Sequence, residues 1–296
     1  MSTAIRLLHG DFGRVALLRM TAPLVVHAHH HCHVLIKAAG SDAAFNVSGM
    51  RVPLTSENAV LVNAWEQHAF ISEAGLGDDP TVILALYIEP SWLQQHCPSI
   101  RERVYSKFFG RSYACLQPHQ IKMIESIVME LWWSDTVARE SIETMLADLS
   151  ISFLRESGGP YRTYSQHYSQ GKNFMDPRIR AAITQMKENP EIAADMAALA
   201  MRVQLSRSHF FELFRRCTGL SPVLYANALK MEQAFKALAA TDRSMEQISQ
   251  ELGFSAQSHF SRFFRQHQGV VPSHYRRNLE SIDLKKSDRQ VNFQAL

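Results

Sequence analysis

The sequence has few cysteines and no long apolar run, and each absence excludes a class of protein. Its 296 residues include four cysteines, Cys32, Cys97, Cys115 and Cys217, and no two of them have Cys-x-x-Cys spacing. This spacing argues against a disulfide framework or a zinc-thiolate site and favours a reducing cytosol. No run reaches the roughly 18 apolar residues of a membrane span, and residues 1–6 do not have the pattern of a secretory signal. We therefore expect a cytoplasmic protein with no membrane partner.

Charged residues are also scarce, at 20% of the chain against 46% hydrophobic residues, which excludes wholesale disorder. Their distribution is uneven. Residues 1–170 contain 13 Lys and Arg against 16 Asp and Glu, a net charge of −3, whereas residues 171–296 contain 18 against 12, a net charge of +6. A basic half joined to a mildly acidic half is typical of a polyanion-binding module attached to another domain.

The first ninety residues predict short β-strands. Brief apolar or alternating runs alternate with Gly, Pro, Asn and Asp, as in a small barrel or sandwich. These runs are Val15–Met20, Val34–Lys37, Phe45–Val47, Ala59–Val62 and Val82–Ile88. Beyond Pro118, apolar residues recur every three or four positions and predict amphipathic helices over residues 119–133 and 139–155. Residues 158–172 contain almost no aliphatic side chains, so we interpret them as a linker.

The C-terminal segment repeats itself with an offset of 50 residues, which falls to 49 at its start, where Leu205-Ser206 matches Phe254-Ser255. Identities in register across a whole unit of this length indicate a duplicated supersecondary structure. The identical positions are Ser208-His209-Phe210 and Ser258-His259-Phe260, Phe214-Arg215 and Phe264-Arg265, Gly219 and Gly269, Pro222 and Pro272, and Tyr225 and Tyr275.

Each copy predicts two short helices joined by a tight turn. The first helices cover Asp195–Arg202 and Ser244–Glu251, and the second helices cover about 206–217 and 255–267. Ser244 and Gln247 have the spacing of a capping box, and Gly253 lies where the first helix of the second copy must end. Such a pair is a helix-turn-helix unit, whose second helix can lie in the major groove of DNA.

The segment between the copies predicts a helix over Ser221 to Ala240. About 20 residues at about 1.5 Å each give a rod of roughly 30 Å. One turn of B-DNA is about 34 Å, so the rod could hold two reading helices in successive major grooves.

Helical geometry sorts each second helix into two faces. Phe210, Leu213, Phe214 and Cys217 are predicted to face inward in the first, and Phe260, Phe263 and Phe264 in the second. The outward faces carry Ser208, Phe211, Glu212 and Arg215 in the first, and Ser258, Ser261, Arg262 and Arg265 in the second. Arg262 could bind guanine O6 and N7, a contact worth roughly 1–3 kcal/mol of discrimination, whereas Glu212 could accept from cytosine N4 or repel phosphate.

With these motifs, the stretch Ala194–Arg277 resembles the DNA-binding domain of the AraC/XylS family of bacterial transcription regulators. The most specific part is ISQELGFSAQSHFSRFFR from Ile248 to Arg265, followed by GVVPSHYR from Gly269. Phe211 and Glu212 depart from the Arg or Gln that the family often places there, so the share of specificity from the first helix stays open. The resemblance implies that the base-facing residues are Arg207, Ser208, Phe211, Glu212, Gln257, Ser258, Ser261 and Arg262.

The densest titratable cluster is HAHHHCH, from His27 to His33. In an extended strand, His27, His29, His31 and His33 would share one face. The resemblance implies a cupin-like barrel, in which H-x-H carries metal ligands and His68 would be a third ligand. The Glu that usually follows H-x-H is absent. Three interpretations stay open: a pocket for an organic effector, often anionic, lined by these four histidines with Trp65 and His68; a divalent metal held by His27, His29 and His68; or histidines without a function.

Together the patterns predict an α+β protein. Residues 1–157 would form a cupin-like domain for effector sensing and dimerisation, 158–172 a linker, 173–282 an AraC-type DNA-binding domain and 283–296 a polar tail. We expect a cytoplasmic, nucleoid-associated transcription regulator that binds double-stranded DNA in a sequence-specific manner and responds to a small molecule such as an organic acid. By the resemblance it would be an activator that contacts RNA polymerase and pairs as a homodimer through the helices at 119–133 and 139–155, with Trp132 and Trp133 at the interface or packed on their own barrel. No required cofactor and no enzymatic activity are expected; the alternative is a metal-dependent cupin enzyme fused to a DNA-binding module.

Overall fold

The structure is a computed structural model that describes residues 2–72, 79–97, 108–133, 139–157, 175–189, 195–240 and 242–279. Contacts divide the chain into two units. The first contains Met1–Val26, His30–Gly159 and Phe264–Leu296, and the second contains His27–His29 and Pro160–Phe263. The predicted linker at 158–172 and the predicted tail at 283–296 lie outside the described residues, so the domain boundaries stay a prediction.

Two antiparallel sheets form the base of the first unit. The five runs predicted from the sequence fall in β2, β3, β4, β6 and β8 of these sheets. In the part of the chain that the structure describes, no ladder joins the two sheets, so the predicted barrel is not closed. The larger sheet has the order β1 (Thr3–Gly10), β2 (Gly13–Met20), β8 (Thr81–Ile88), β3 (Cys32–Ala39), β6 (Asn58–Val62), β9 (Tyr113–Cys115), and the smaller has β5 (Met50–Leu54), β4 (Ala43–Val47), β7 (His68–Ile71).

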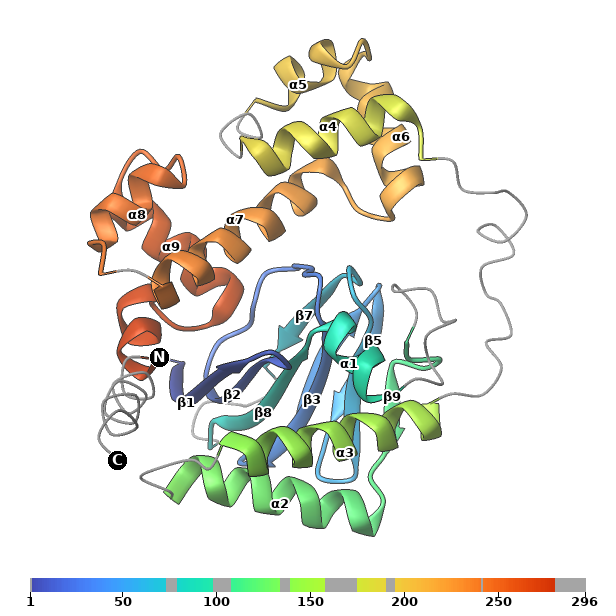
Figure 1. Cartoon of the computed structure of the whole chain (residues 1–296), viewed down its shortest axis with the longest axis vertical. Coiled ribbons are helices and arrows are strands. Elements are labelled where there is room, and N and C mark those ends of the chain that lie inside the picture. Colours follow the sequence, from blue (N-terminus) through green and yellow to red (C-terminus); the bar gives the residue numbers. More distant parts are fainter. Residues whose placement is uncertain are drawn as a thin grey trace, which may run out of the picture. The chain divides into compact units, whose positions relative to one another are not determined.

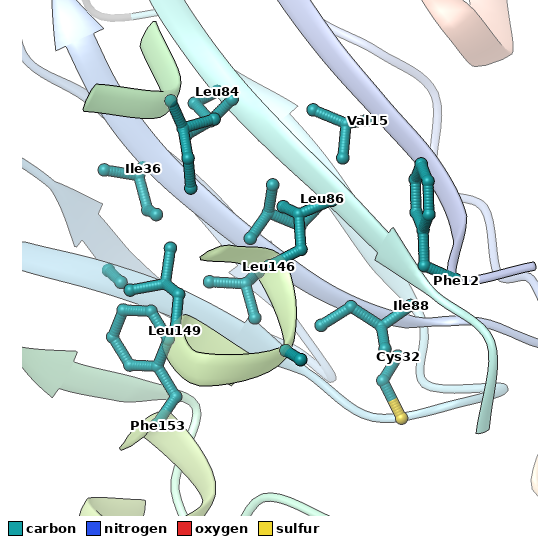
Figure 2. Close-up of a cluster of buried hydrophobic side chains, with 14 of the residues drawn as sticks. Phe12, Val15, Cys32, Ile36, Leu84, Leu86, Ile88, Leu146, Leu149 and Phe153 are labelled. Atoms are coloured by element: carbon teal, nitrogen blue, oxygen red, sulfur yellow. The ribbon is translucent and has the colours of Figure 1, made fainter. Parts of the chain in front are cut away.

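The core of the first unit lies between the larger sheet and helix α3 (Arg139–Ser157). Figure 2 shows Leu146, Leu149 and Phe153 of α3 in one apolar cluster with Ile36 of β3 and Leu86 of β8. Helix α2 (Pro118–Trp133) runs beside α3 and adds Ile124, Ile127 and Leu131 to this core (Figure 1). Both helices lie where the three- and four-residue spacing predicted them. Helix α1 (Pro90–His96) is a short connection after β8.

The described C-terminal segment, residues 264–279, also belongs to the first unit. Tyr275 is fully buried, and its hydroxyl lies 2.9 Å from His9 Nε2 on β1. The same hydroxyl accepts a hydrogen bond of 3.3 Å from the guanidinium of Arg14 on β2. The amide of Gln268 donates to the hydroxyl of Tyr87 on β8 at 3.3 Å. Three polar side chains of the sheet are therefore bonded to this C-terminal segment.

The second unit is helical among its described residues from 175 to 263. Helix α4 (Pro177–Glu188) packs against α6 (Arg207–Thr218) and α7 (Pro222–Ala240). Helix α5 (Met196–Arg202) precedes α6, while α8 (Met245–Glu251) precedes α9 (Gln257–Gln268). Figure 1 shows α7 running from the α5–α6 pair toward the α8–α9 pair. These boundaries agree with the predicted helices to within about two residues. No described helix is both long enough and apolar enough to span a membrane.

Side-chain caps fix where these helices begin. Asp195 accepts from the backbone N–H groups of Ala197 and Ala198, both at 3.0 Å. Ser244 accepts from the N–H of Gln247, and the Gln247 side chain accepts from the N–H of Ser244. The capping box predicted from the spacing is therefore confirmed. Each cap satisfies backbone donors that the first turn of a helix leaves without a helical partner.

Candidate DNA-binding surface and histidine cluster

The turns of the two helix-turn-helix units have the same backbone shape. In the first turn, Gln204 has φ 57° and Leu205 N–H donates to Ala200 C=O at 2.9 Å. In the second turn, Gly253 has φ 73° and Phe254 N–H donates to Ser249 C=O at 2.9 Å. Both units therefore use one residue in the left-handed region to bring the second helix across the first. Glycine adopts this region without steric cost, whereas glutamine adopts it at a steric cost.

The inward faces of α6 and α9 are equivalent. Phe210, Phe214, Phe260 and Phe264 are all fully buried. Phe214 meets the ring of Tyr225 edge-on with centroids 5.6 Å apart, and Phe264 meets Tyr275 in the same way at 5.4 Å. The remaining residues predicted to face inward are Leu213, which is buried, and Cys217 and Phe263, which are half-buried. The sequence repeat is therefore a repeat of the packed scaffold.

Most of the positions predicted to face outward are exposed. Phe211 and Ser261 are half-buried; the other eight predicted positions are exposed. Side chains that would read bases must be free of the protein core, and this requirement is met. Contact with DNA by these residues stays a prediction. The eight exposed positions are Arg207, Ser208, Glu212, Arg215, Gln257, Ser258, Arg262 and Arg265.

Helices α6 and α9 have the same net charge, but it comes from different sets of charged residues. Helix α6 has three arginines and Glu212, whereas α9 has two arginines and no acidic residue, so each has a net charge of +2. On α6, Glu212 lies 3.9 Å from Arg216 as an i,i+4 pair, and the Arg207 guanidinium carbon lies 5.6 Å from the centroid of the Phe211 ring. An exposed pair of this kind adds little stability, so its main effect is on the charge that α6 presents.

The histidine run is not one extended strand, so the prediction that its histidines share a strand face is wrong. Strand β3 begins at Cys32, and of the run only Cys32 and His33 lie on it. His31 and His33 are buried in the first unit, which also contains Trp65 and His68. His27 and His29 group with the second unit, where their ring centroids are 6.0 Å apart. The predicted metal set of His27, His29 and His68 is thus divided between the two units and stays a prediction.

A buried pair of imidazoles lies within the first unit. His68 Nδ1 donates to the carbonyl oxygen of Glu66 at 2.9 Å, so its Nε2 accepts from His33 Nδ1 at 3.3 Å. Burial lowers the pKa of His68 to about 4, which leaves it neutral near pH 7. The His33 ring stacks on Tyr87 with centroids 4.0 Å apart, and the guanidinium of Arg14 lies 3.8 Å from the centre of the Tyr87 ring. These contacts form a continuous polar stack from His68 to Arg14.

A second cluster contains Glu89, which the sequence reasoning missed. His30 Nε2 lies 3.2 Å from Glu89 Oε2, and His31 Nε2 lies 3.8 Å from the same oxygen. The hydrogen bond with His30 holds the pKa of Glu89 below its usual value. Glu89 is 59 residues from His30 in the chain, and the pairing of Cys32 with Ile88 brings the two segments together. Only the strand register, which the sequence pattern does not specify, could have revealed this cluster.

A cleft of about 440 Å³ is present beside β9, at the ends of α2 and α3. It was also missed, because its lining comes from three separate elements. Its lining residues are Arg111, Tyr113, Ala114, Cys115, Gln117, His119, Glu156 and Ser157.

Comparison with known proteins identifies the helical repeat. Residues 199–278 match a family model described as a helix-turn-helix domain. The chain is 31% identical over 94 residues to the MmsAB operon regulatory protein of Pseudomonas aeruginosa, covering 32% of this chain and 31% of that protein. It is also 31% identical over 107 residues to the arabinose operon regulatory protein of Salmonella typhimurium, covering 36% and 38%. The repeat is an AraC/XylS-type helix-turn-helix domain.

The two alignments cover about a third of this chain and about a third of the length of these curated relatives. A structural likeness extends over both units. ToxT of Vibrio cholerae, solved with a bound unsaturated fatty acid, aligns over 90% of this chain and 95% of its own with a TM-score of 0.53 and 13% identity. At this identity the likeness is one of fold, and it confirms the α+β fold with β-sheets before the AraC/XylS-type domain.

Proposed function

We propose that this protein is a sequence-specific DNA-binding transcription regulator whose N-terminal unit binds a small-molecule effector. The observation that carries the proposal is the pair of AraC/XylS-type helix-turn-helix units, with equivalent buried faces and different exposed faces. A shared scaffold with unlike exposed side chains is what two readers of different base sequences require. The two curated relatives are named as regulators, which supports a role other than catalysis in a bacterial cytoplasm.

On DNA, α6 and α9 would each enter a major groove. The connecting helix α7 has 19 residues and so a length of about 28 Å, close to the roughly 34 Å turn of B-DNA. Arg207 and Arg262 would read base edges, while exposed arginines such as Arg215 would meet phosphate. Each recognition helix has a net charge of +2, which suits a polyanion.

The buried stack gives the first unit a means of coupling to the C-terminal segment. It runs from His68 through His33 and Tyr87 to Arg14, and Arg14 donates to Tyr275 after α9. An organic acid bound beside the histidines would favour one arrangement of this stack over another. By shifting that population, it would change the position of the segment that ends the second helix-turn-helix unit.

Pairing with a second copy of the chain would use the exposed apolar residues of α2. Ile121, Met129 and Trp133 are 37%, 58% and 72% exposed, and their spacing of eight and four residues places them on one face. Trp132 instead packs against the core of its own unit. We propose a homodimer through this face and activation by contact with RNA polymerase.

The proposal is tested by selecting sequences from a random duplex library with the full chain and measuring binding by fluorescence anisotropy. We expect two half-sites about 10 base pairs apart, because the two reading helices would lie on one face of the duplex. The logarithm of the affinity should fall with the logarithm of salt concentration, by about 0.9 for each phosphate contact. Equal affinity for all sequences, or an affinity insensitive to salt, would contradict the proposal.

A further inference from the structure

The cluster of His30, His31 and Glu89 lies outside the buried stack used in the proposed function. The two histidines directly precede β3, and Glu89 directly follows β8. Their ligand atoms all lie within 4.8 Å of one another. Strands β3 and β8 are paired along their length, so the approach of the two segments is fixed by backbone hydrogen bonds. All three residues belong to the first unit.

The carboxylate of Glu89 is oriented by its neighbours. Ser91 Oγ donates to Oε1 at 3.2 Å, whereas Oε2 faces the two imidazoles. The backbone N–H of Glu89 donates to Phe12 C=O at 2.7 Å. Such outer contacts are the kind that hold a metal-binding carboxylate in one orientation.

Gly13 allows this close approach. It has φ 110°, and a Cβ there would lie 3.1 Å from Glu89 N and 3.2 Å from His31 Cδ2. The same Cβ would lie 2.3 Å from Tyr87 C=O, so a larger residue would push β2 away from the end of β8. The backbone therefore leaves room for the His31 ring and Glu89 to sit side by side.

We propose that His30 Nε2, His31 Nε2 and Glu89 Oε2 bind a divalent transition metal, with Zn²⁺ as the expected ion. Two imidazole nitrogens and one carboxylate oxygen are a common ligand set for such ions. Ligand atoms about 2.0–2.2 Å from a tetrahedral ion lie about 3.3–3.6 Å apart. The two observed distances to Glu89 Oε2, 3.2 and 3.8 Å, are near this range.

The exposure of the cluster suits a metal with an open coordination position. The His30 and Glu89 side chains are 32% and 31% exposed, whereas His31 is nearly buried. A metal bound to the three residues would thus keep one coordination position open to water or to a small anion, on the side away from His31. This site is different from the predicted set of His27, His29 and His68, and it does not depend on the proposed DNA-binding function.

The first test is zinc titration by calorimetry with the full chain, free of any polyhistidine tag. We expect one tight site that Glu89→Gln and His31→Ala each weaken by at least about 100-fold, more than the loss of an outer contact costs. Ser91→Ala should weaken it by about 10-fold, in line with the loss of an outer partner. His96→Ala on α1 is the matched control and should bind zinc as the parent does. Circular dichroism checks that each variant is folded.

The double variant H27A/H29A separates this site from the other histidines. It should keep the tight zinc site, and loss of that site in the double variant with retention in Glu89→Gln would overturn the proposal. A measurement without variants is X-ray absorption of the zinc-loaded parent chain. It should fit two imidazole nitrogens and carboxylate oxygen at about 2.0–2.2 Å. A fit with three or more imidazoles, or the absence of a tight site, would also overturn it.

Discussion

The first helix-turn-helix unit, α5–α6, and the second, α8–α9, are most alike where they are buried and least alike where they are exposed. Phe214 on Tyr225 and Phe264 on Tyr275 are nearly the same contact, with centroids 5.6 and 5.4 Å apart. The exposed positions 212 and 262 carry opposite charges, Glu212 and Arg262. Packing thus restricts the inward face to one solution, while the exposed face can vary without cost to the fold.

The largest effect should come from removing the matched core rings. We expect Phe214→Ala and Phe264→Ala each to lower the free energy of unfolding by about 3–5 kcal/mol, because each ring is fully buried and leaves a cavity. Urea unfolding followed by circular dichroism measures both values. Similar losses would support the equivalence of the two scaffolds.

The control for this pair is Val223→Ala, on an exposed position of α7, which should change stability little. A loss above 3 kcal/mol at one phenylalanine together with less than about 1 kcal/mol at the other would show that the two cores are not equivalent, whatever their geometry.

The next effect is on DNA recognition and should differ between the two helix-turn-helix units, α5–α6 and α8–α9. Arg262→Ala should reduce discrimination at one base pair by about 1–3 kcal/mol, because it removes a bidentate contact with guanine. Glu212→Ala should leave affinity unchanged or raise it, since it removes a negative charge from the face of α6. Anisotropy titrations with the selected site and its single-base variants measure both.

Arg262→Lys is the matched control, because it keeps the charge but removes the planar pair of donors. If Arg262→Ala weakened binding to every sequence by the same factor, Arg262 would contact phosphate rather than a base. A loss of discrimination in Glu212→Ala would make Glu212 a reader as well.

Much of the helical domain could be predicted from the sequence because its information is local. The three- and four-residue period, the spacing of Ser244 and Gln247, and the 50-residue offset all describe contacts within one element or between identical elements. The structure therefore departs from the predicted helices by only about two residues at their ends.

The sheets and the histidines were harder to predict because their contacts join distant residues. Nothing in a single strand says whether two sheets close into a barrel, and among the described residues they do not. Strand β3 begins only at Cys32, so most of the histidine run precedes the strand. The alternation expected of an extended strand did not indicate this starting point. Glu89 joins His30 only through the register of β3 and β8, which is set by the whole sheet.

A smaller effect tests whether the equivalent tyrosines have the same role. Tyr275→Phe removes the hydroxyl that accepts from Arg14 and contacts His9, so we expect a loss of about 1.5 kcal/mol in unfolding free energy. Tyr225→Phe is the equivalent change beside the first helix-turn-helix pair, α5–α6, and should cost less, because hydrogen bonds to a charged donor are the stronger kind. Thermal and urea unfolding measure both variants. Equal losses would contradict a special role for Arg14.

The smallest effect concerns the turns, where Gln204 and Gly253 have the same left-handed backbone. A side chain in this region costs roughly 1–2 kcal/mol. Replacing it by glycine removes this cost, but part of the resulting stabilisation is lost because glycine has more conformational freedom in the unfolded chain. We therefore expect Gln204→Gly to stabilise the protein by up to about 1 kcal/mol and Gly253→Ala to destabilise it by about 1 kcal/mol. Urea unfolding of both variants, with Gln204→Ala as the control that keeps a Cβ, measures the difference. If Gln204→Gly were instead destabilising, the side chain of Gln204 would contribute to the first turn more than the backbone strain costs.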